Sequence, residues 1–253
     1  MLNVQVKIDS TNLLATKVNL SRSWIWATEG VTQFVIGESE FAVRNLAGTI
    51  YLALYRALPA ILEPVPADLR HLINADAFSS LDKRASHLIE HLKSEAQLDP
   101  DAEEVGDCLE GLWEWKMRRT IEIDRVIPEP NLWAWCDGSQ CFIECLLPPE
   151  YDDTANPKRI LISYAVSKAT LVSVCDQFRE QLRDQVKENL VRRQLDAEVQ
   201  PAQLANYLAA LAEPFTVESI IGRTTSATDW DKVRYWYRRL EGDIDSNEHK
   251  SKK

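Results

Sequence analysis

The chain has 253 residues, of which 45% are hydrophobic and 27% are charged, and its formal net charge is −10. This is the composition of a globular protein that is long enough to bury a substantial core. The most apolar stretch, residues 50–62, is too short to cross a bilayer, so no membrane partner is expected. The negative charge makes nucleic acid an unfavoured partner, because phosphate backbones require positive potential.

The N-terminal segments predict antiparallel strands followed by helices. Residues 4–8 alternate between apolar and polar, as in a half-buried strand. Trp24 and Trp26 stand two residues apart, so a strand places both on one face. Glu29-Gly30 is expected as the turn that leads into the next strand. Further elements are expected as a strand at 41–43 and as helices at 46–58 (capped by Asn45), 66–73 and 79–96.

The helix expected at 101–117 has two contrasting faces. Its apolar residues recur at helical spacing, which predicts a face that packs against the core. A stripe of carboxylates follows another face of the same helix. The apolar face comprises Val105, Cys108, Leu109, Leu112 and Trp113, and the acidic stripe comprises Glu103, Asp107, Glu110 and Glu114.

The second half of the chain repeats the strand and helix signals. A strand is expected at 120–127, and a hairpin follows in which Trp133 and Trp135 share a face. Asp137-Gly138 between apolar runs is a strong hairpin signal. Further elements are expected as a strand at 159–166 and as helices after Ser167 (a capping residue) and at 201–211, 216–221 and 229–240.

These elements predict an α+β fold in which antiparallel β-hairpins pack against several α-helices. Residues 1–240 are expected to form a single domain, and 241–253 a disordered polar tail. The two Trp-x-Trp segments are alike in sequence. Either an internal duplication or two unrelated hairpins of similar pattern accounts for the likeness.

Several segments resemble an uncharacterised bacterial family known only as a domain of unknown function. The residues that carry the resemblance lie in 41–73, especially 58–69, in the hairpin at 133–138 and in the helix after Ser167. That family has no established catalytic residues, so the resemblance assigns none here. In size and composition the chain is also similar to immunity proteins of bacterial toxin systems.

One short motif points to metal chemistry. His87, Glu90 and His91 follow the H-x-x-E-H order of inverted zinc metallopeptidases, in which the two histidines bind zinc and the glutamate is the general base. A third protein ligand would be required. The alternative is a solvated helix face, and no metal or other cofactor is assigned.

The cysteines give a weaker indication. Cys136, Cys141 and Cys145 form a run without the C-x-x-C spacing of common zinc sites, so buried thiols are the preferred interpretation. The total of five cysteines is odd, and the N-terminus lacks the pattern of a secretory signal. Reduced thiols and a cytoplasmic location are therefore expected.

Two readings of the charged segments remain. The mixture of basic and aromatic residues at 230–239 suits either single-stranded nucleic acid or an amphipathic helix whose arginines pair with acids. The net charge favours the helix. The acidic stripe, with Asp152 and Asp153, favours docking of a basic protein. The expected function is thus non-enzymatic protein binding, with immunity-type neutralisation of a basic toxin or nuclease as its specific form; the alternatives are a zinc-dependent hydrolase and a nucleic-acid-associated protein.

Overall fold

The computed structural model of the protein describes residues 1–8, 29–73, 85–92, 103–122, 131–147, 160–192, 205, 208–209, 211–222 and 227–242. Two antiparallel sheets and several helices confirm the expected α+β class. Residues 85–92 are helical as well. The labelled elements, in chain order, are β1 (Leu2–Ile8), β2 (Glu29–Ile36), β3 (Ser39–Leu46), α2 (Ala47–Leu62), η2 (Ala67–Leu72), α4 (Glu103–Leu109), η3 (Glu110–Glu114), α5 (Trp115–Met117), β4 (Thr120–Glu122), β5 (Asn131–Cys136), β6 (Gln140–Leu147), β7 (Ile160–Ser167), α6 (Lys168–Arg192), α8 (Val217–Ile221) and α9 (Trp230–Glu241).

The first sheet has the strand order β1-β2-β3. The expected turn at Glu29-Gly30 is wrong, because Gly30 lies within β2 and pairs with Ile8 on one side and Asn45 on the other. The turn is at Gly37, whose φ of 66° suits a residue without a Cβ. Both Gly30 and Gly37 are suited to a turn. The turn at Gly37 is favoured because it lets β2 continue to Ile36 and bury alternate residues from 30 to 36. Trp24 and Trp26 lie outside the described residues.

Two expectations about the first long helix need correction. Asn45 does not cap it, because β3 continues to Leu46 and α2 starts directly at Ala47. Pro59 was expected to kink or to end this helix, and it does not end it, since α2 runs through this proline to Leu62. Pro66 does start the next helix: it is the N-cap of η2, a 3-10 helix rather than an α-helix.

The second sheet has the order β4-β5-β6-β7. Its central hairpin turns at Gly138, with φ 107°, which confirms the Asp137-Gly138 prediction. Trp135 stacks on its cross-strand partner Phe142 with ring centroids 4.4 Å apart. Trp133 lies on the same face of the hairpin as Trp135, and it donates its indole N–H to Glu144 at 3.0 Å.

The carboxylate of Asp137 organises this turn. It accepts hydrogen bonds of 2.8 Å from the backbone N–H groups of Gln140 and Ser139 and from the Ser139 hydroxyl. These bonds lower the pKa of Asp137 to about 2 from its ordinary 3.8.

We therefore expect the turn to depend on pH only in strong acid. Because the folded pKa of Asp137 is depressed, its contribution to stability is complete above pH 3.8 and is lost as the pH falls toward 2. Carboxyl ¹³C shifts measured between pH 1.5 and 6 should give Asp137 a midpoint near 2. A midpoint near 3.8 in the folded protein would mean that these hydrogen bonds do not hold the charged form.

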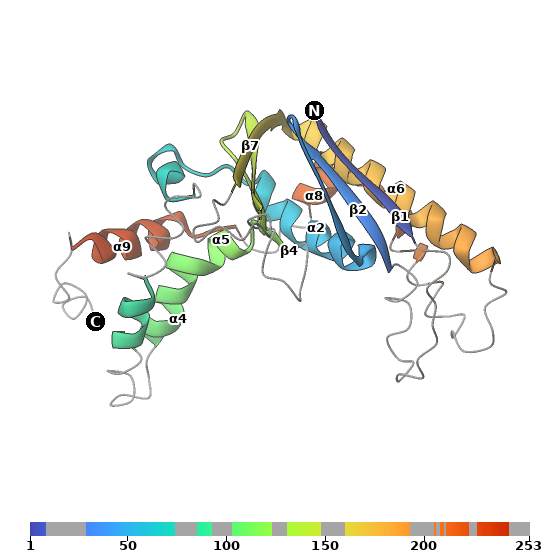
Figure 1. Ribbon diagram of the computed structural model, residues 1–253. Coiled ribbons are helices and arrows are strands. Elements are labelled where there is room, and N and C mark those ends of the chain that lie inside the picture. The colour runs from blue at the N-terminus through green and yellow to red at the C-terminus, as the bar shows by residue number, and fades with distance from the viewer. Residues whose placement is uncertain are drawn as a thin grey trace, which may run out of the picture.

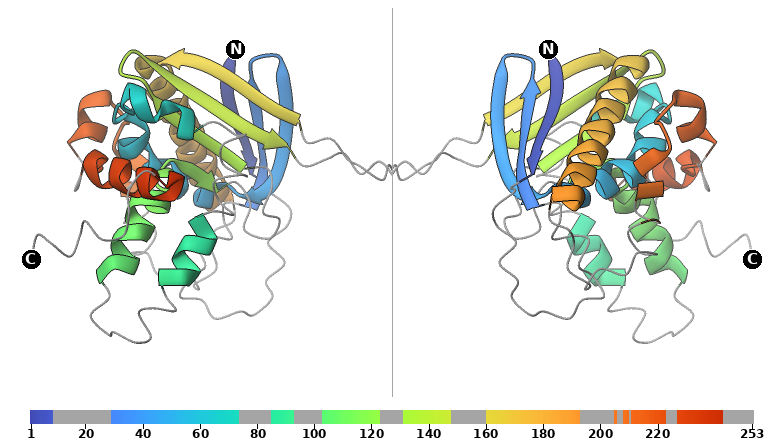
Figure 2. Two further views of the ribbon diagram at one scale, coloured as in Figure 1. Left: turned by 90° about the vertical axis from the view of Figure 1, so that its left-hand side faces the viewer. Right: turned by 90° about the vertical axis from the view of Figure 1, so that its right-hand side faces the viewer.

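Each of the two sheets leads directly into a long helix. β3 is followed at once by α2, and β7 by α6, in which Thr170 donates its N–H to the predicted cap Ser167 at 3.0 Å. Both helices contact both sheets: α6 packs mainly on β1 and also touches β6 and β7, while α2 packs on β4 and β5 as well as on β2 and β3 (Figure 1). The strands of the two sheets run in different directions, as Figure 2 shows. The acid-Gly pairs that follow the two Trp-x-Trp segments in the sequence differ in structure, since Glu29-Gly30 lies in a strand and Asp137-Gly138 in a turn.

The β5–β6 hairpin has a hydrophobic cluster on each side. Its inner residues, such as Ala134 and Ile143, join a cluster formed with the first sheet, α2 and α6. Trp135 on its outer face joins a second cluster formed by η2, residues 85–92, α4 to α5 and α9. Alternation along a strand makes this division, because successive side chains point to opposite faces. The elements that form this second cluster also contain most of the charged residues singled out in the sequence.

Candidate functional site: the charged face of α4 and α9

The predicted acidic stripe faces α9. Lys232 of α9 donates its ammonium to Asp107 at 2.9 Å and to Glu110 at 2.7 Å. Glu114 pairs with Arg118 at 3.5 Å, one turn further along. Glu103 begins α4, whereas Asp152 and Asp153 lie outside the described residues. The structure therefore brings together Asp107 and Glu110, and it adds a cation that the sequence analysis did not pair with them.

Arg234 lies two residues after Lys232, on the opposite margin of the buried side of α9, and it repeats this arrangement. Its guanidinium donates to both carboxylate oxygens of Asp68, at 2.7 and 3.2 Å, and to Asp231 at 2.9 Å. The hydrogen bond from Arg234 lowers the pKa of Asp68. The bonds to Glu110 and Asp107 raise the pKa of Lys232. Each cation thus stands between two carboxylates. The two groups lie along the two margins of the exposed side of α9, with Asp231 on that side between them. We call this set the ion-pair face: Asp68, Asp107, Glu110, Asp231, Lys232 and Arg234.

Local sequence explains why α9 presents these residues. Asp229 caps the helix by accepting the backbone N–H groups of Asp231 and Lys232, and Gly242 ends it in the left-handed conformation. Val233, Trp236 and Tyr237 are buried against the second cluster. Their spacing turns Lys232 and Arg234 toward the carboxylates at the helix margin. The predicted amphipathic packing of this helix, with basic residues paired to acids, is confirmed.

α9 lies close to the preceding helix because of a glycine. A Cβ on Gly111 would meet Trp236 Cδ1 at 2.4 Å and the carbonyl oxygen of Lys232 at 3.2 Å. Gly111 is in η3, a single π-helical turn between α4 and α5. Turns of this type insert one residue into an α-helix and are frequent at functional sites. The glycine thereby sets the distance between the acidic residues of this helix and Lys232.

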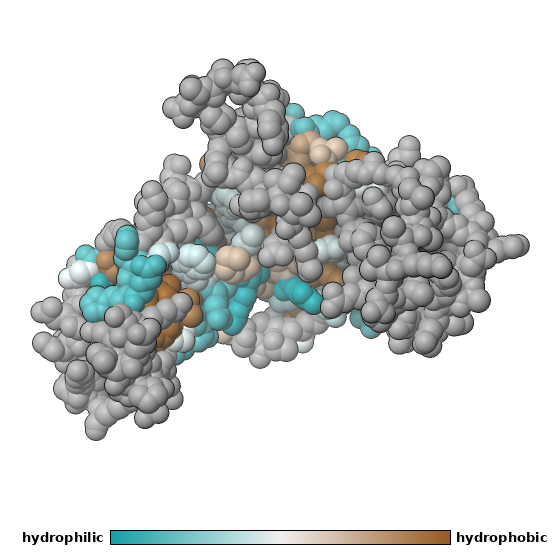
Figure 3. All heavy atoms as spheres, turned by 60° about the horizontal axis from the view of Figure 1, so that its bottom comes forward, coloured by the Kyte–Doolittle hydropathy of each residue, from teal (hydrophilic) through white to brown (hydrophobic). Residues whose placement is uncertain are grey.

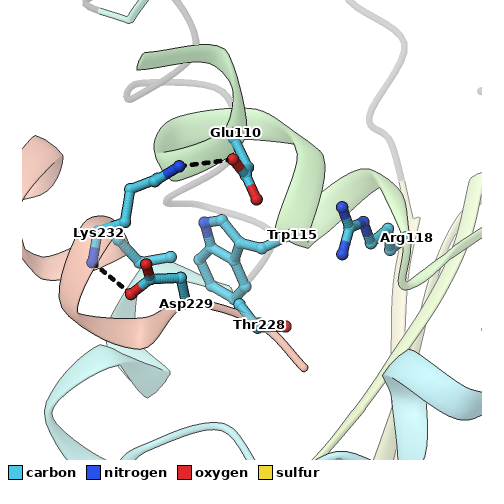
Figure 4. Close-up of a pocket in the computed structure, with 7 residues that line it drawn as sticks. Glu110, Trp115, Arg118, Thr228, Asp229 and Lys232 are labelled. Carbon is cyan, nitrogen blue, oxygen red and sulfur yellow. Dashed lines mark hydrogen bonds and ion pairs between the residues drawn. The ribbon is translucent and has the colours of Figure 1, made fainter. Parts of the chain in front are cut away.

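A shallow pocket opens at this contact (Figure 4). Glu110 and Trp115 line one wall, and Lys232 of α9 and its N-cap residue Asp229 face them. Its volume is about 220 Å³ including the open mouth. Pockets that enclose small molecules hold roughly 300–1,000 Å³. The pocket is therefore too small for a typical substrate or cofactor.

A buried ion pair contacts two of the residues that line the pocket, Trp115 and Thr228. Arg119, with 0% exposure, donates to Glu63 at 2.9 Å and to the carbonyl oxygen of Trp115 at 2.6 Å. Thr228 binds the same carboxylate through its backbone N–H at 2.8 Å and its hydroxyl at 2.5 Å. The guanidinium lies 5.7 Å from the ring centroid of Trp115 and 5.2 Å from that of Trp230.

This network was missed in the sequence analysis, which ended the apolar face at Trp113. The helical spacing continues through 112, 115 and 119, and it was the available sign that Trp115 and Arg119 share that face. Burial lowers the pKa of Arg119 to about 10, although Glu63 opposes the shift. The guanidinium is still cationic at neutral pH, so Glu63 neutralises a charge that has no water around it.

The alternative zinc motif occupies an exposed helix face. His87, Glu90 and His91 are exposed on 85–92, while Ile89 and Leu92 are buried. Cys136, Cys141 and Cys145 point into the first cluster. Within the described ranges, no three histidine, cysteine, aspartate or glutamate side chains gather in a way that could hold a metal ion. Neither sequence motif acquires a further ligand from these parts of the chain.

The segment at 230–239, which was the alternative site for nucleic acid, makes its contacts within the protein. Lys232 and Arg234 bind carboxylates, and the Arg239 guanidinium lies 5.0 Å from the ring centroid of Trp236. Trp236 and Tyr237 are buried. Stacking of bases needs exposed ring faces, which these two aromatic residues do not offer.

Comparisons with protein-family models, curated proteins and solved structures gave no match to this chain. In the part of the chain that the structure describes, no helix combines the length and apolarity required to cross a membrane.

Proposed function

We propose that the chain is a non-enzymatic protein-binding module whose ion-pair face takes a basic protein. The observation that supports this proposal is that the four carboxylates of that face outnumber its cations, which are Lys232 and Arg234 together with Arg238 near Asp68. Asp107 and Glu110 keep 51% and 42% of their side chains exposed, and Asp231 keeps 94%. The excess negative charge is therefore accessible to a second molecule.

The ion-pair face suits a cationic partner for a geometric reason. A carboxylate has about four lone-pair positions, so one bond to Lys232 leaves room for a partner's lysine or arginine. The helices hold these carboxylates in place before binding, which limits the entropy lost on association. Complementary charge mainly speeds encounter and orients the partner.

Apolar docking has less support on the described surface. The exposed large hydrophobic residues there belong to different elements, as Met1, Met117, Leu161 and Ile221 do. Figure 3 shows the coloured part of one face as a mosaic of hydrophobic and hydrophilic residues. A binding mode that relies on charge is consistent with this distribution.

The test compares two pairs of neutralising substitutions. Asp107→Asn with Asp231→Asn removes two charges from the ion-pair face, and Asp184→Asn with Glu188→Gln removes two exposed charges from α6 as the matched control. Neutralisation is preferable to a change of Asp107 and Glu110 to lysine, which would crowd cations around Lys232 and separate α4 from α9.

A partner captured from the native cell lysate by the unaltered chain would be purified and titrated calorimetrically against all three proteins. At about 0.5–1 kcal/mol per rim charge, the face variant should bind roughly 5- to 30-fold more weakly, and higher salt should reduce this difference. The control should bind within twofold of the unaltered chain. Equal affinity of both variants, or a partner that is not basic, would contradict the proposal.

The specific form of this proposal is immunity-type neutralisation of a basic toxin or nuclease in the cytoplasm. It adds one requirement, namely that binding abolishes the partner's activity. An activity titration of the captured partner with the unaltered chain should then end at one equivalent. If the partner kept its full activity in the saturated complex, the chain would still be a binding module, but the immunity role would be contradicted.

A further inference from the structure

Two buried cysteines face each other across the β5–β6 hairpin. Cys136 ends β5, and its cross-strand partner in the register is Cys141 of β6. Both thiols are free, each residue has 0% exposure, and the two side chains are hydrogen-bonded to each other. Cys145, four residues further along β6 and on the same face, pairs instead with Leu132 and Ile162.

The hairpin places this pair at a position that suits a disulfide. Asp137 donates its N–H to the carbonyl oxygen of Gln140 at 3.0 Å, so residues 137 and 140 form the hydrogen-bonded pair next to the turn. Hydrogen-bonded and non-hydrogen-bonded pairs alternate, which makes Cys136 and Cys141 a non-hydrogen-bonded pair with Cα atoms about 4.5 Å apart. Disulfides join Cα atoms separated by roughly 4.4–6.8 Å. The backbone register therefore satisfies the main geometric requirement without rearrangement.

The turn provides the path by which an oxidant reaches the pair. Gly138 donates its N–H to the sulfur of Cys136 at 3.2 Å, which places this sulfur directly under the turn. Gly138, Ser139 and Gln140 are exposed. Opening of this short turn would break the contact of Gly138 with the Cys136 sulfur. Burial raises the pKa of Cys141 to about 12, so Cys141 is suited to react second, once its neighbour has been activated.

We infer that Cys136 and Cys141 are a redox-active dithiol, which closes to a cross-strand disulfide when the folded protein meets a disulfide oxidant such as glutathione disulfide. The Cys136 thiolate attacks one sulfur of glutathione disulfide and expels one glutathione thiolate. The Cys141 thiolate then attacks the Cys136 sulfur of the mixed disulfide and expels the second. One protein dithiol is oxidised by two electrons, and one glutathione disulfide is reduced to two glutathione molecules, which take up the two protons.

The bridge would close the end of the hairpin that is docked on η2 and the segment before it. Val65 donates its N–H to the carbonyl oxygen of Cys136 at 2.8 Å, and Arg70 donates to that of Asp137 at 2.8 Å. A covalent link between the strands restricts the unfolded chain, so oxidation should raise the thermal midpoint of unfolding.

The full-length native chain would be equilibrated with mixtures of glutathione disulfide and glutathione, quenched in acid, alkylated and analysed by mass spectrometry. The expected product has lost 2 Da and carries three alkyl groups, where the reduced chain carries five. Cys136, Cys141 and Cys145 share the tryptic peptide 126–158, which should carry one alkyl group in place of three. Cleavage within that peptide then places the alkyl group on Cys145.

Three alanine variants complete the experiment. Cys145→Ala should still form the bridge, whereas Cys136→Ala and Cys141→Ala should keep all four remaining thiols free or stop at a glutathione adduct. Circular dichroism recorded during oxidation should retain the spectrum of the folded chain. Five alkylated cysteines at every glutathione ratio, a bridge that involves Cys145, or oxidation seen only above the thermal midpoint would overturn the inference.

Discussion

Replacement of Glu63 by glutamine should lower the free energy of unfolding by about 3–5 kcal/mol, the typical cost of removing one partner from a buried ion pair. The change leaves the Arg119 guanidinium charged with 0% exposure and without a counter-charge. It also places an amide NH₂ where a carboxylate oxygen accepts hydrogen bonds from Thr228. Urea unfolding followed by circular dichroism at pH 7 measures the change.

Three further variants separate the charge effect from simple loss of packing. Arg119→Met keeps an unbranched chain between Trp115 and Trp230 but leaves Glu63 without its cation. Combined with Glu63→Gln, it should cost less than the sum of the two single changes, because neither charge is then stranded. Arg118→Met, in the exposed neighbouring pair with Glu114, should cost no more than about 1 kcal/mol. Additive losses in the double variant would show that Glu63 and Arg119 do not act as a pair.

Replacement of Gly111 by alanine should destabilise the protein by about 1–3 kcal/mol, the usual cost of overpacking a core. The added Cβ would stand 2.4 Å from Trp236, whose side chain is 2% exposed and enclosed by the second cluster. Alanine favours a helix by up to about 1 kcal/mol over glycine, so the steric cost must exceed this gain. α9 would have to move outward, which would also draw Lys232 away from Asp107 and Glu110.

Gly106 provides the matched control for this substitution. It lies in α4, one turn earlier, and nothing stands within 4 Å of a Cβ built on it. Gly106→Ala should therefore stabilise the chain by about 0.5–1 kcal/mol through helix propensity alone. Urea unfolding and near-ultraviolet circular dichroism of the tryptophans would distinguish the two variants. The same sign of effect in both would mean that Gly111 does not determine how closely α9 approaches.

Local patterns in the sequence were sufficient for much of the fold. The alternation in β5 and β6 and the Asp137-Gly138 turn predicted the central hairpin, and Ser167 predicted the start of α6. Such features depend on neighbouring residues, so they can be read without the rest of the chain. The turn wrongly placed at Glu29-Gly30 shows the limit of this reading. Gly30 and Gly37 were both suitable, and the pairing of β2 with β1 and β3 decided between them.

The sequence by itself determined that the helix at 101–117 has an acidic stripe and that α9 is amphipathic, because both are periodicities within one segment. Only the tertiary structure decided that Lys232 joins Asp107 and Glu110, which precede it by 125 and 122 residues. The tertiary structure also joined Glu63 to Thr228, which are 165 residues apart. Both lie beside the buried Arg119, although arginine is a residue type that is usually exposed. Such contacts depend on how closely two helices approach, and here that distance follows from the missing side chain of Gly111.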